Sequence, residues 1–118
     1  MKILLVHNQY KQKGGEDVVF EAEKGLLERY GHEVIEYVEH NDRIDAMGKL
    51  SMAVNTIWSR QSKRAIADVL AKEKPDVAHF HNTFMVISPS AYYACRSAGV
   101  PVVQTLHNYR LLCPHAIF

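Results

Sequence analysis

The sequence has few of the features that mark small secreted, metal-bound or membrane-spanning domains. It contains two cysteines, Cys95 and Cys113, which have neither the number nor the spacing of a disulfide framework or a zinc site. We therefore expect reduced thiols in a cytoplasmic protein. No apolar run approaches the roughly 20 residues that span a bilayer. The apolar start, Met1 to Val6, is too short for a signal-peptide core and is typical of a buried first strand.

Motifs for several common activities are also missing. The sequence contains no Gly-x-Gly-x-x-Gly segment and no Walker lysine motif, so Rossmann-type dinucleotide binding and P-loop hydrolysis lose their usual sequence support. No constellation of serine, cysteine or carboxylate residues indicates nucleophilic catalysis, and nothing marks Cys113 as an activated thiol. Repeats and linker-like tracts are absent from the sequence, which favours a single domain over residues 1–118.

The composition is that of an ordinary soluble globular protein, but its charge is unevenly distributed. Residues 1–45 carry six basic and ten acidic side chains, whereas residues 46–74 carry six basic and two acidic ones. The basic side chains of the second segment are Lys49, Arg60, Lys63, Arg64, Lys72 and Lys74. They are typical of a solvated helix face. The sharper alternative is peripheral contact of the 49–74 region with anionic lipid at the inner face of the membrane, with Met52, Ile57 and Trp58 as apolar anchors. Nucleic acid is not expected as a partner, because basic and aromatic residues do not interleave.

Apolar strand patterns and helical patterns alternate along the chain. Strands are expected at 2–6, 33–38, 76–80 and 100–106, and helices at 16–30, in two pieces within 51–73, and from Ser88 to Gly99. Gly31 is expected to end the first helix in a left-handed conformation, and Ser88 to cap the last helix with Pro89 in its first turn. This alternation predicts an α/β fold, a Rossmann-like three-layer parallel sheet with right-handed crossovers.

The apolar spacing also predicts which helix faces are buried. In the first helix the residues at helical spacing are Val19, Phe20, Glu23, Leu26, Leu27 and Tyr30, with Glu23 as the polar exception. In the last helix they are Ala91, Tyr92, Ala94, Cys95 and Ala98.

Ligands of open parallel sheets bind outside the carboxyl ends of the strands. A histidine and an asparagine follow three of the expected strands, at 7–8, 81–82 and 107–108. His107 at such a position can hydrogen-bond a sugar hydroxyl or handle a proton near neutral pH, or it is simply a satisfied histidine at a strand end. His81 lies just past the end of the expected strand and is a candidate to face a ligand. The alternation of side chains along that strand places His79 inside it, so a structural role is expected for His79. A metal site of His7, His81 and His107 has no ligand-spacing motif to support it, so no metal is expected.

Gly14 and Gly15 precede the first helix. Glycines at a helix start let a ligand approach the backbone, and the free N–H groups there favour a phosphate or diphosphate. A plain turn that needs positive φ is an equally good interpretation of the two residues alone.

Three stretches together resemble a known family. They are HN at 7–8 followed by GGEDVVFE at 14–21, KPDVAHFHNTF at 74–84, and GVPVVQTLHNYR at 99–110. In this order, and at these strand ends, they resemble the N-terminal domain of glycosyltransferases with the GT-B fold, of the family-4 type. The resemblance covers the whole chain.

The resemblance implies transfer of a sugar from a nucleotide-sugar donor to an acceptor hydroxyl on a sugar or lipid-linked acceptor, with retention of configuration and without a metal or other cofactor. Gly14 and Gly15 would lie beside the donor diphosphate, with their N–H groups stabilising it, and His107 beside the transferred sugar as the catalytic residue. His81, Asn82 and Arg110 would line the acceptor side.

In such enzymes a second, C-terminal domain holds most of the donor, and the chain contains no counterpart of it. We therefore expect the 118-residue chain to be inactive by itself and to self-associate through an exposed sheet edge. The alternatives are another sugar-nucleotide enzyme of GT-B type, such as an epimerase, and a non-catalytic α/β binding or regulatory module.

Overall fold

The computed structural model describes residues 1–9, 14–40, 48–82 and 87–107 of the chain. In chain order the elements are β1 (Lys2–Gln9), α1 (Gly15–Arg29), β2 (Glu33–His40), α2 (Lys49–Ile57), α3 (Arg60–Glu73), β3 (Val77–Asn82), α4 (Ser90–Ser97) and β4 (Val102–Gln104). The strands form one parallel sheet in the order β2-β1-β3-β4. The predicted α/β class and parallel sheet are thus confirmed, and the architecture is consistent with a Rossmann-like fold.

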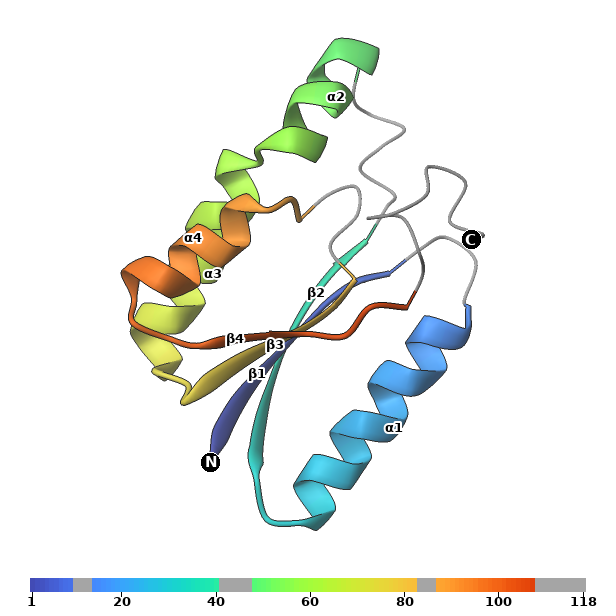
Figure 1. Ribbon diagram of the computed structural model, residues 1–118, viewed down its shortest axis with the longest axis vertical. Coiled ribbons are helices and arrows are strands. Elements are labelled where there is room, and N and C mark those ends of the chain that lie inside the picture. The colour runs from blue at the N-terminus through green and yellow to red at the C-terminus, as the bar shows by residue number, and fades with distance from the viewer. Residues whose placement is uncertain (10–13, 41–47, 83–86, 108–118) are drawn as a thin grey trace.

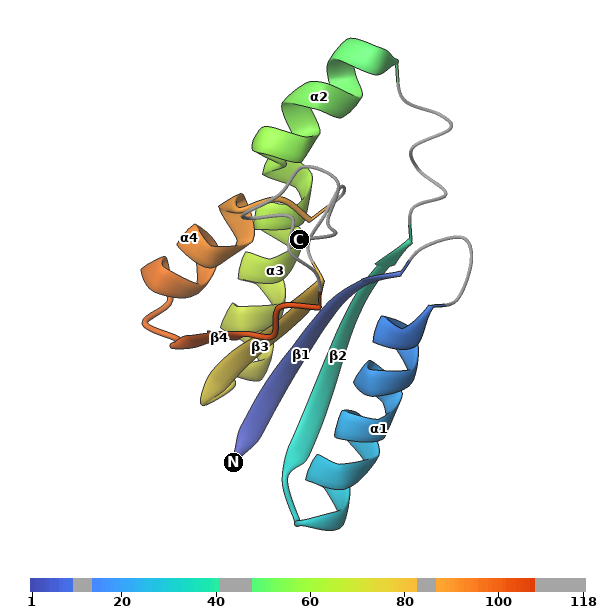
Figure 2. The same ribbon diagram turned by 45° about the vertical axis from the view of Figure 1, so that its right-hand side comes forward.

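Helices cover both faces of the sheet, which gives three layers (Figure 1). The chain moves from β1 to β2 toward one edge, and from β2 through β3 to β4 toward the other. Crossovers of one hand must then place α1 on one face and α3 and α4 on the other. Figure 2 shows this separation, with α2 lying beyond the sheet at the end where the strands finish.

Alternation along β1 divides the core into two parts. Leu4 and Val6 pack with Ile66 of α3 and Phe80 of β3 in the larger cluster, which α4 completes. On the other face a smaller cluster packs Ile3 and Leu5 against Phe20 of α1. Burial of one fully enclosed aliphatic or aromatic side chain contributes about 1.5–3 kcal/mol, so the first cluster supplies most of the hydrophobic stabilisation.

β1, β2 and β3 extend beyond their predicted ends, whereas β4 (Val102–Gln104) is shorter than the predicted strand at 100–106. β1 continues to Gln9 and β2 to His40, and the two remain paired in register up to those residues. β3 likewise continues through His81 to Asn82, with a register shift where it passes Val6 and His7 of β1. Main-chain pairing extends these strands beyond the last apolar residue. The predicted loop starting at His7 and the predicted strand exit at His81 are therefore wrong, because both residues lie within strands.

Two helix ends agree with the prediction, and the start of α4 does not. Gly31 and Gly99 adopt φ values of 84° and 70°, which confirms both as left-handed residues that end a helix. The predicted capping of α4 by Ser88 is wrong. Ser88 itself has a φ of 59°, and Pro89 occupies the N-cap. The Ser88 hydroxyl instead accepts a hydrogen bond from the Ser59 N–H at 2.8 Å, which joins the starts of α3 and α4.

The predicted buried faces of the helices are only partly correct. In α1, Phe20 is buried and Leu27 is half-buried, but Val19, Leu26 and Tyr30 are exposed. The buried stripe of α1 therefore runs through polar positions as well as apolar ones. In α4, Ala98 is exposed, because the helix ends at Ser97 and turns away at Gly99.

Within the described ranges, no helix combines the length and the apolar character needed to cross a bilayer.

Candidate functional site

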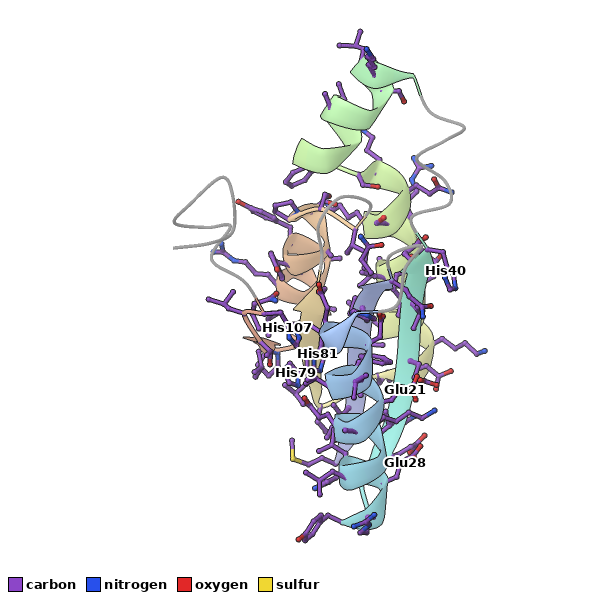
Figure 3. All side chains as sticks on the ribbon, turned by 90° about the vertical axis from the view of Figure 1, so that its right-hand side faces the viewer. Glu21, Glu28, His40, His79, His81 and His107 are labelled. Carbon is purple, nitrogen blue, oxygen red and sulfur yellow. The ribbon has the colours of Figure 1, made fainter. Side chains whose placement is uncertain are left out.

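The candidate site lies at the carboxyl ends of β1 and β3. These neighbouring strands send their connections to opposite faces of the sheet, so the strand order reverses between them. Ligands of doubly wound sheets bind at such a reversal. His79 and His81 on β3 and His107 after β4 gather here beside α1 (Figure 3).

A buried carboxylate joins the end of β1 to the start of α1. The Asp17 Oδ1 atom lies 2.7 Å from His7 Nε2, and Asp17 Oδ2 accepts a hydrogen bond of 2.7 Å from the Gly14 N–H. His7 also stacks on Phe20 with ring centroids 5.0 Å apart. Both partners are buried, so this pair fixes the first turn of α1 against β1. Asp17 was not predicted as a site residue, and its only sequence signal is an acidic residue in a first helical turn.

Gly14 and Gly15 are placed at the start of α1, as predicted. Gly14 is the N-cap with φ −115° and ψ −176°, and Gly15 is the first helical residue. Neither residue has positive φ, so the interpretation as a left-handed turn is wrong. A Cβ atom on Gly14 would meet only the Glu16 Cγ atom, at 3.8 Å, and one on Gly15 would meet no atom within 4 Å. Packing against the described residues therefore does not require glycine at either position.

Two histidines of β3 face α1 and meet one of its carboxylates. Glu23 Oε1 lies 2.5 Å from His79 Nδ1, and Glu23 Oε2 lies 3.1 Å from His81 Nε2. The second ring nitrogen of His79, Nε2, lies 2.7 Å from Thr105 Oγ1. Glu23 and His79 were not predicted as site residues. The available signal was the polar exception that Glu23 makes on the inner face of α1, opposite a strand with two histidines.

His81 and His107 form a hydrogen-bonded pair. His81 Nδ1 lies 3.1 Å from His107 Nε2, and the two rings stack with centroids 5.3 Å apart. The His81 side chain is fully buried. Burial lowers the pKa of His81 to about 4, and three neighbouring imidazoles act in the same direction. His81 is therefore neutral at physiological pH, and it holds the ring of the half-buried His107.

The remaining predicted residues are placed only in part. Asn82 ends β3 and is paired in register with His7. Its side chain and the whole of Arg110 lie outside the described residues. The structure thus brings Gly14, His81 and His107 to one end of the sheet, and it adds a network of carboxylates to them.

A cavity of about 280 Å³ opens on the α1 side of β1 and β2. Its walls include His7, Asp17, Phe20, Glu21 and Val38. Carboxylates beside an aromatic ring are suited to hydroxyl groups more than to anions.

The basic segment carries its charges on α3 and around Trp58. Lys63 Nζ lies 5.4 Å from the centre of the Trp58 ring, which packs on Tyr93 at 5.1 Å. Arg60 and Arg64 are exposed. Trp58 is thus held at the surface beside basic groups, whereas the Met52 and Ile57 side chains lie outside the described residues.

Comparison with models of known protein families gives no match for this chain. The curated proteins and the solved structures give no significant match either.

Proposed function

We propose that this chain is the acceptor-side domain of a retaining glycosyltransferase of GT-B type. It would bind the diphosphate of a nucleotide sugar at Gly14 and Gly15 and would place His107 beside the transferred sugar. The fold alone does not select this activity, since parallel α/β sheets carry many functions. The support comes from the site and from the three sequence stretches that resemble the family.

The observation that carries the proposal is the pair of glycines without a structural requirement. Their backbone angles suit any residue, and a Cβ atom would have room at both positions. A ligand that approaches the backbone closely would give a physical reason for glycine at the start of a helix that faces a strand-order reversal.

The first turn of α1 sets which amides are available for a phosphate. The Gly14 N–H donates to the Asp17 carboxylate, so in this proposal it supports the turn and does not contact the diphosphate directly. The next two amides, those of Gly15 and Glu16, belong to the first helical turn, whose N–H groups have no acceptor within the helix. The carboxylate of Glu16 opposes an anion, whereas Asp17 is directed inward to His7. We therefore assign the phosphate contact to the Gly15 side of the turn.

His81 has a revised role in this proposal. Because its side chain is buried and hydrogen-bonded to His107, we assign it as a positioning residue instead of a direct acceptor contact. His107 would then contact the sugar through Nδ1, the ring nitrogen that His81 does not use. Departure of the nucleotide diphosphate, with attack of an acceptor hydroxyl on the same face, would require a group that stabilises charge on the leaving phosphate. The first turn of α1 would supply it.

The test uses nitrogen-15 NMR of the 118-residue chain with UDP-glucose and GDP-mannose as probes. We expect one sugar nucleotide to shift the amide signals of Gly15 and His107. Gly14→Ala and Gly15→Ala should weaken this binding about tenfold or more, equivalent to roughly 1.4 kcal/mol, because a methyl group would occupy the space of the phosphate. The unfolding free energy should hardly change, because neither Cβ atom clashes.

Gly25→Ala and Gly48→Ala are matched controls. Each Cβ atom would again meet nothing within 4 Å, but neither residue is at the site. Both controls should bind like the wild type. No signal shift with either probe, or equal binding by all four alanine variants, would contradict the proposal.

A further inference from the structure

Three potential ligand atoms for a metal meet between α1 and β3. They are a carboxylate oxygen of Glu23, Nδ1 of His79 and Nε2 of His81, and they all lie within 4.8 Å of one another. We propose that these residues bind one divalent transition-metal ion of the zinc class. This inference goes beyond the transferase proposal and does not depend on it.

The ligand set has the chemistry that zinc prefers. Two imidazole nitrogens and one carboxylate form a common three-ligand set, with a fourth position left for water or a substrate oxygen. With bond lengths near 2.05 Å, tetrahedral ligand atoms lie roughly 3.3 Å apart. The separation of 3.1 Å between Glu23 Oε2 and His81 Nε2 is already close to this value, and the separation of 2.5 Å between the other oxygen, Oε1, and His79 Nδ1 would widen as the carboxylate turns. Glu23 is partly exposed, which gives its side chain room for this shift.

Each histidine also has a partner for its other ring nitrogen. His79 Nε2 lies 2.7 Å from Thr105 Oγ1, and His81 Nδ1 lies 3.1 Å from His107 Nε2. Histidines that ligate metals nearly always donate this second N–H to such a group, which fixes the tautomer and the direction of the lone pair. Here both outer partners lie near the end of β4 and hold the two rings from the side away from Glu23.

A second observation points to a missing cation. Among the residues that the structure describes, His81 Nε2 is fully buried and makes no hydrogen bond, although Glu23 Oε2 is 3.1 Å away. With the His81 proton on Nδ1, directed to His107, the Nε2 lone pair faces a carboxylate oxygen, and the two atoms repel each other. A buried polar atom without a partner destabilises the fold. A metal ion between the two atoms would remove this destabilisation.

This ligand set differs from a metal site formed by His7, His81 and His107. His7 directs Nε2 to Asp17, and its ring centroid is 6.4 Å from that of His81. His107 directs Nε2 to His81 instead of toward the cluster. A bound ion at Glu23 would link α1 to β3 and orient His107 through His81. The ion would therefore couple its buried ligands to the orientation of the His107 side chain at the end of the sheet.

The test titrates the metal-stripped 118-residue chain with ZnCl₂ by calorimetry and with CoCl₂ by visible absorption. We expect one equivalent of Zn²⁺ to bind, and Co²⁺ to give the intense visible bands of a four-coordinate site. Glu23→Gln and His79→Gln should each lower the Zn²⁺ affinity by at least a hundredfold. Thr105→Val should lower it about tenfold, because it removes only an outer partner.

Glu28→Gln and His40→Gln are the controls. Glu28 is exposed on α1 and His40 is exposed at the end of β2, and both lie away from the cluster (Figure 3). These variants should bind Zn²⁺ like the wild type. If Glu23→Gln fails to fold, the nitrogen-15 signals of the wild-type imidazoles decide, since Zn²⁺ must shift His79 Nδ1 and His81 Nε2 selectively. If Zn²⁺ does not bind the wild-type chain one-to-one, the proposal is overturned. It is also overturned if His40→Gln loses Zn²⁺ binding while Glu23→Gln retains it.

Discussion

Asp17→Asn should lower the free energy of unfolding by about 3 kcal/mol. The Asp17 carboxylate uses one oxygen for the Gly14 N–H and the other for His7 Nε2, at 2.7 Å each. Asparagine has only one oxygen, so it can accept only one of these bonds. The amide group would then face the other partner as a donor. The charge-assisted bond to that partner is lost, and if the partner is His7 Nε2, the His7 proton must move to the other ring nitrogen.

The hydrogen-bond partners of His7 determine how much stability Asp17→Asn loses. If the asparagine oxygen keeps the Gly14 bond, its amide faces His7 Nε2, and His7 must carry its proton on Nδ1. That atom is buried and has no hydrogen-bond partner within the described part of the chain. A hydrogen bond to a charged group contributes about 1.5–3 kcal/mol, and an unsatisfied buried donor costs about 1–3 kcal/mol. The lost charge-assisted bond and the stranded donor together, reduced by partial relaxation of the site, give the value of about 3 kcal/mol.

Urea unfolding at pH 7.5 measures this loss, with Asp68→Asn as the control. Asp68 is exposed on α3, so the same change of charge there should alter stability by less than about 0.5 kcal/mol. Amide hydrogen exchange at Gly14 and Gly15 should also become faster in Asp17→Asn, because the first turn of α1 loses its attachment to β1. A stability loss below about 1 kcal/mol would refute the reasoning that this buried pair fixes the start of α1.

Two further predictions concern pH and the basic surface. The pKa of His81 is lowered to about 4, against about 6.5 in the unfolded chain, so the unfolded chain binds more protons between these values. Stability should therefore fall as the pH decreases through this window, by at most about 3 kcal/mol. Urea unfolding in EDTA at pH 7 and pH 4.5 should show a smaller fall in His81→Gln, and an equal fall would refute this source. Lys63→Gln combined with Arg64→Gln should weaken sedimentation with phosphatidylserine vesicles roughly thirtyfold, since each basic group near such a surface contributes about 1 kcal/mol. Unchanged sedimentation would leave these residues as a solvated helix face.

The order of elements could be predicted because it depends on local patterns. The apolar run before His7 and the glycines at Gly31 and Gly99 act within a few residues, and each is found where expected. Strand ends could not be predicted in the same way. His7 and His81 remain in strands because neighbouring strands supply partners for their backbone groups, and no local pattern encodes a partner.

The candidate site was predictable as a location but not as a set of contacts. Strand-end position was enough to select His81 and His107, which the structure joins directly. It was not enough to find Asp17 and Glu23, because each acts on a histidine from another element. Glu23 stands out only after α1 is known to lie against β3, since its burial depends on the rotation of that helix. The exposure of Val19 shows that apolar spacing alone gives this rotation incorrectly.

The position of α1 therefore links the features of the site. Its first turn holds His7 through Asp17, and the next turns place Glu23 against His79 and His81. The apolar anchor between these contacts is Phe20, which packs on the rings of both His7 and His81. A group bound at the start of α1 and an ion bound at Glu23 would each restrict the same helix. Because one rigid helix carries both contacts, binding at either place would reduce the ordering cost at the other, which is the physical condition for coupling between two sites.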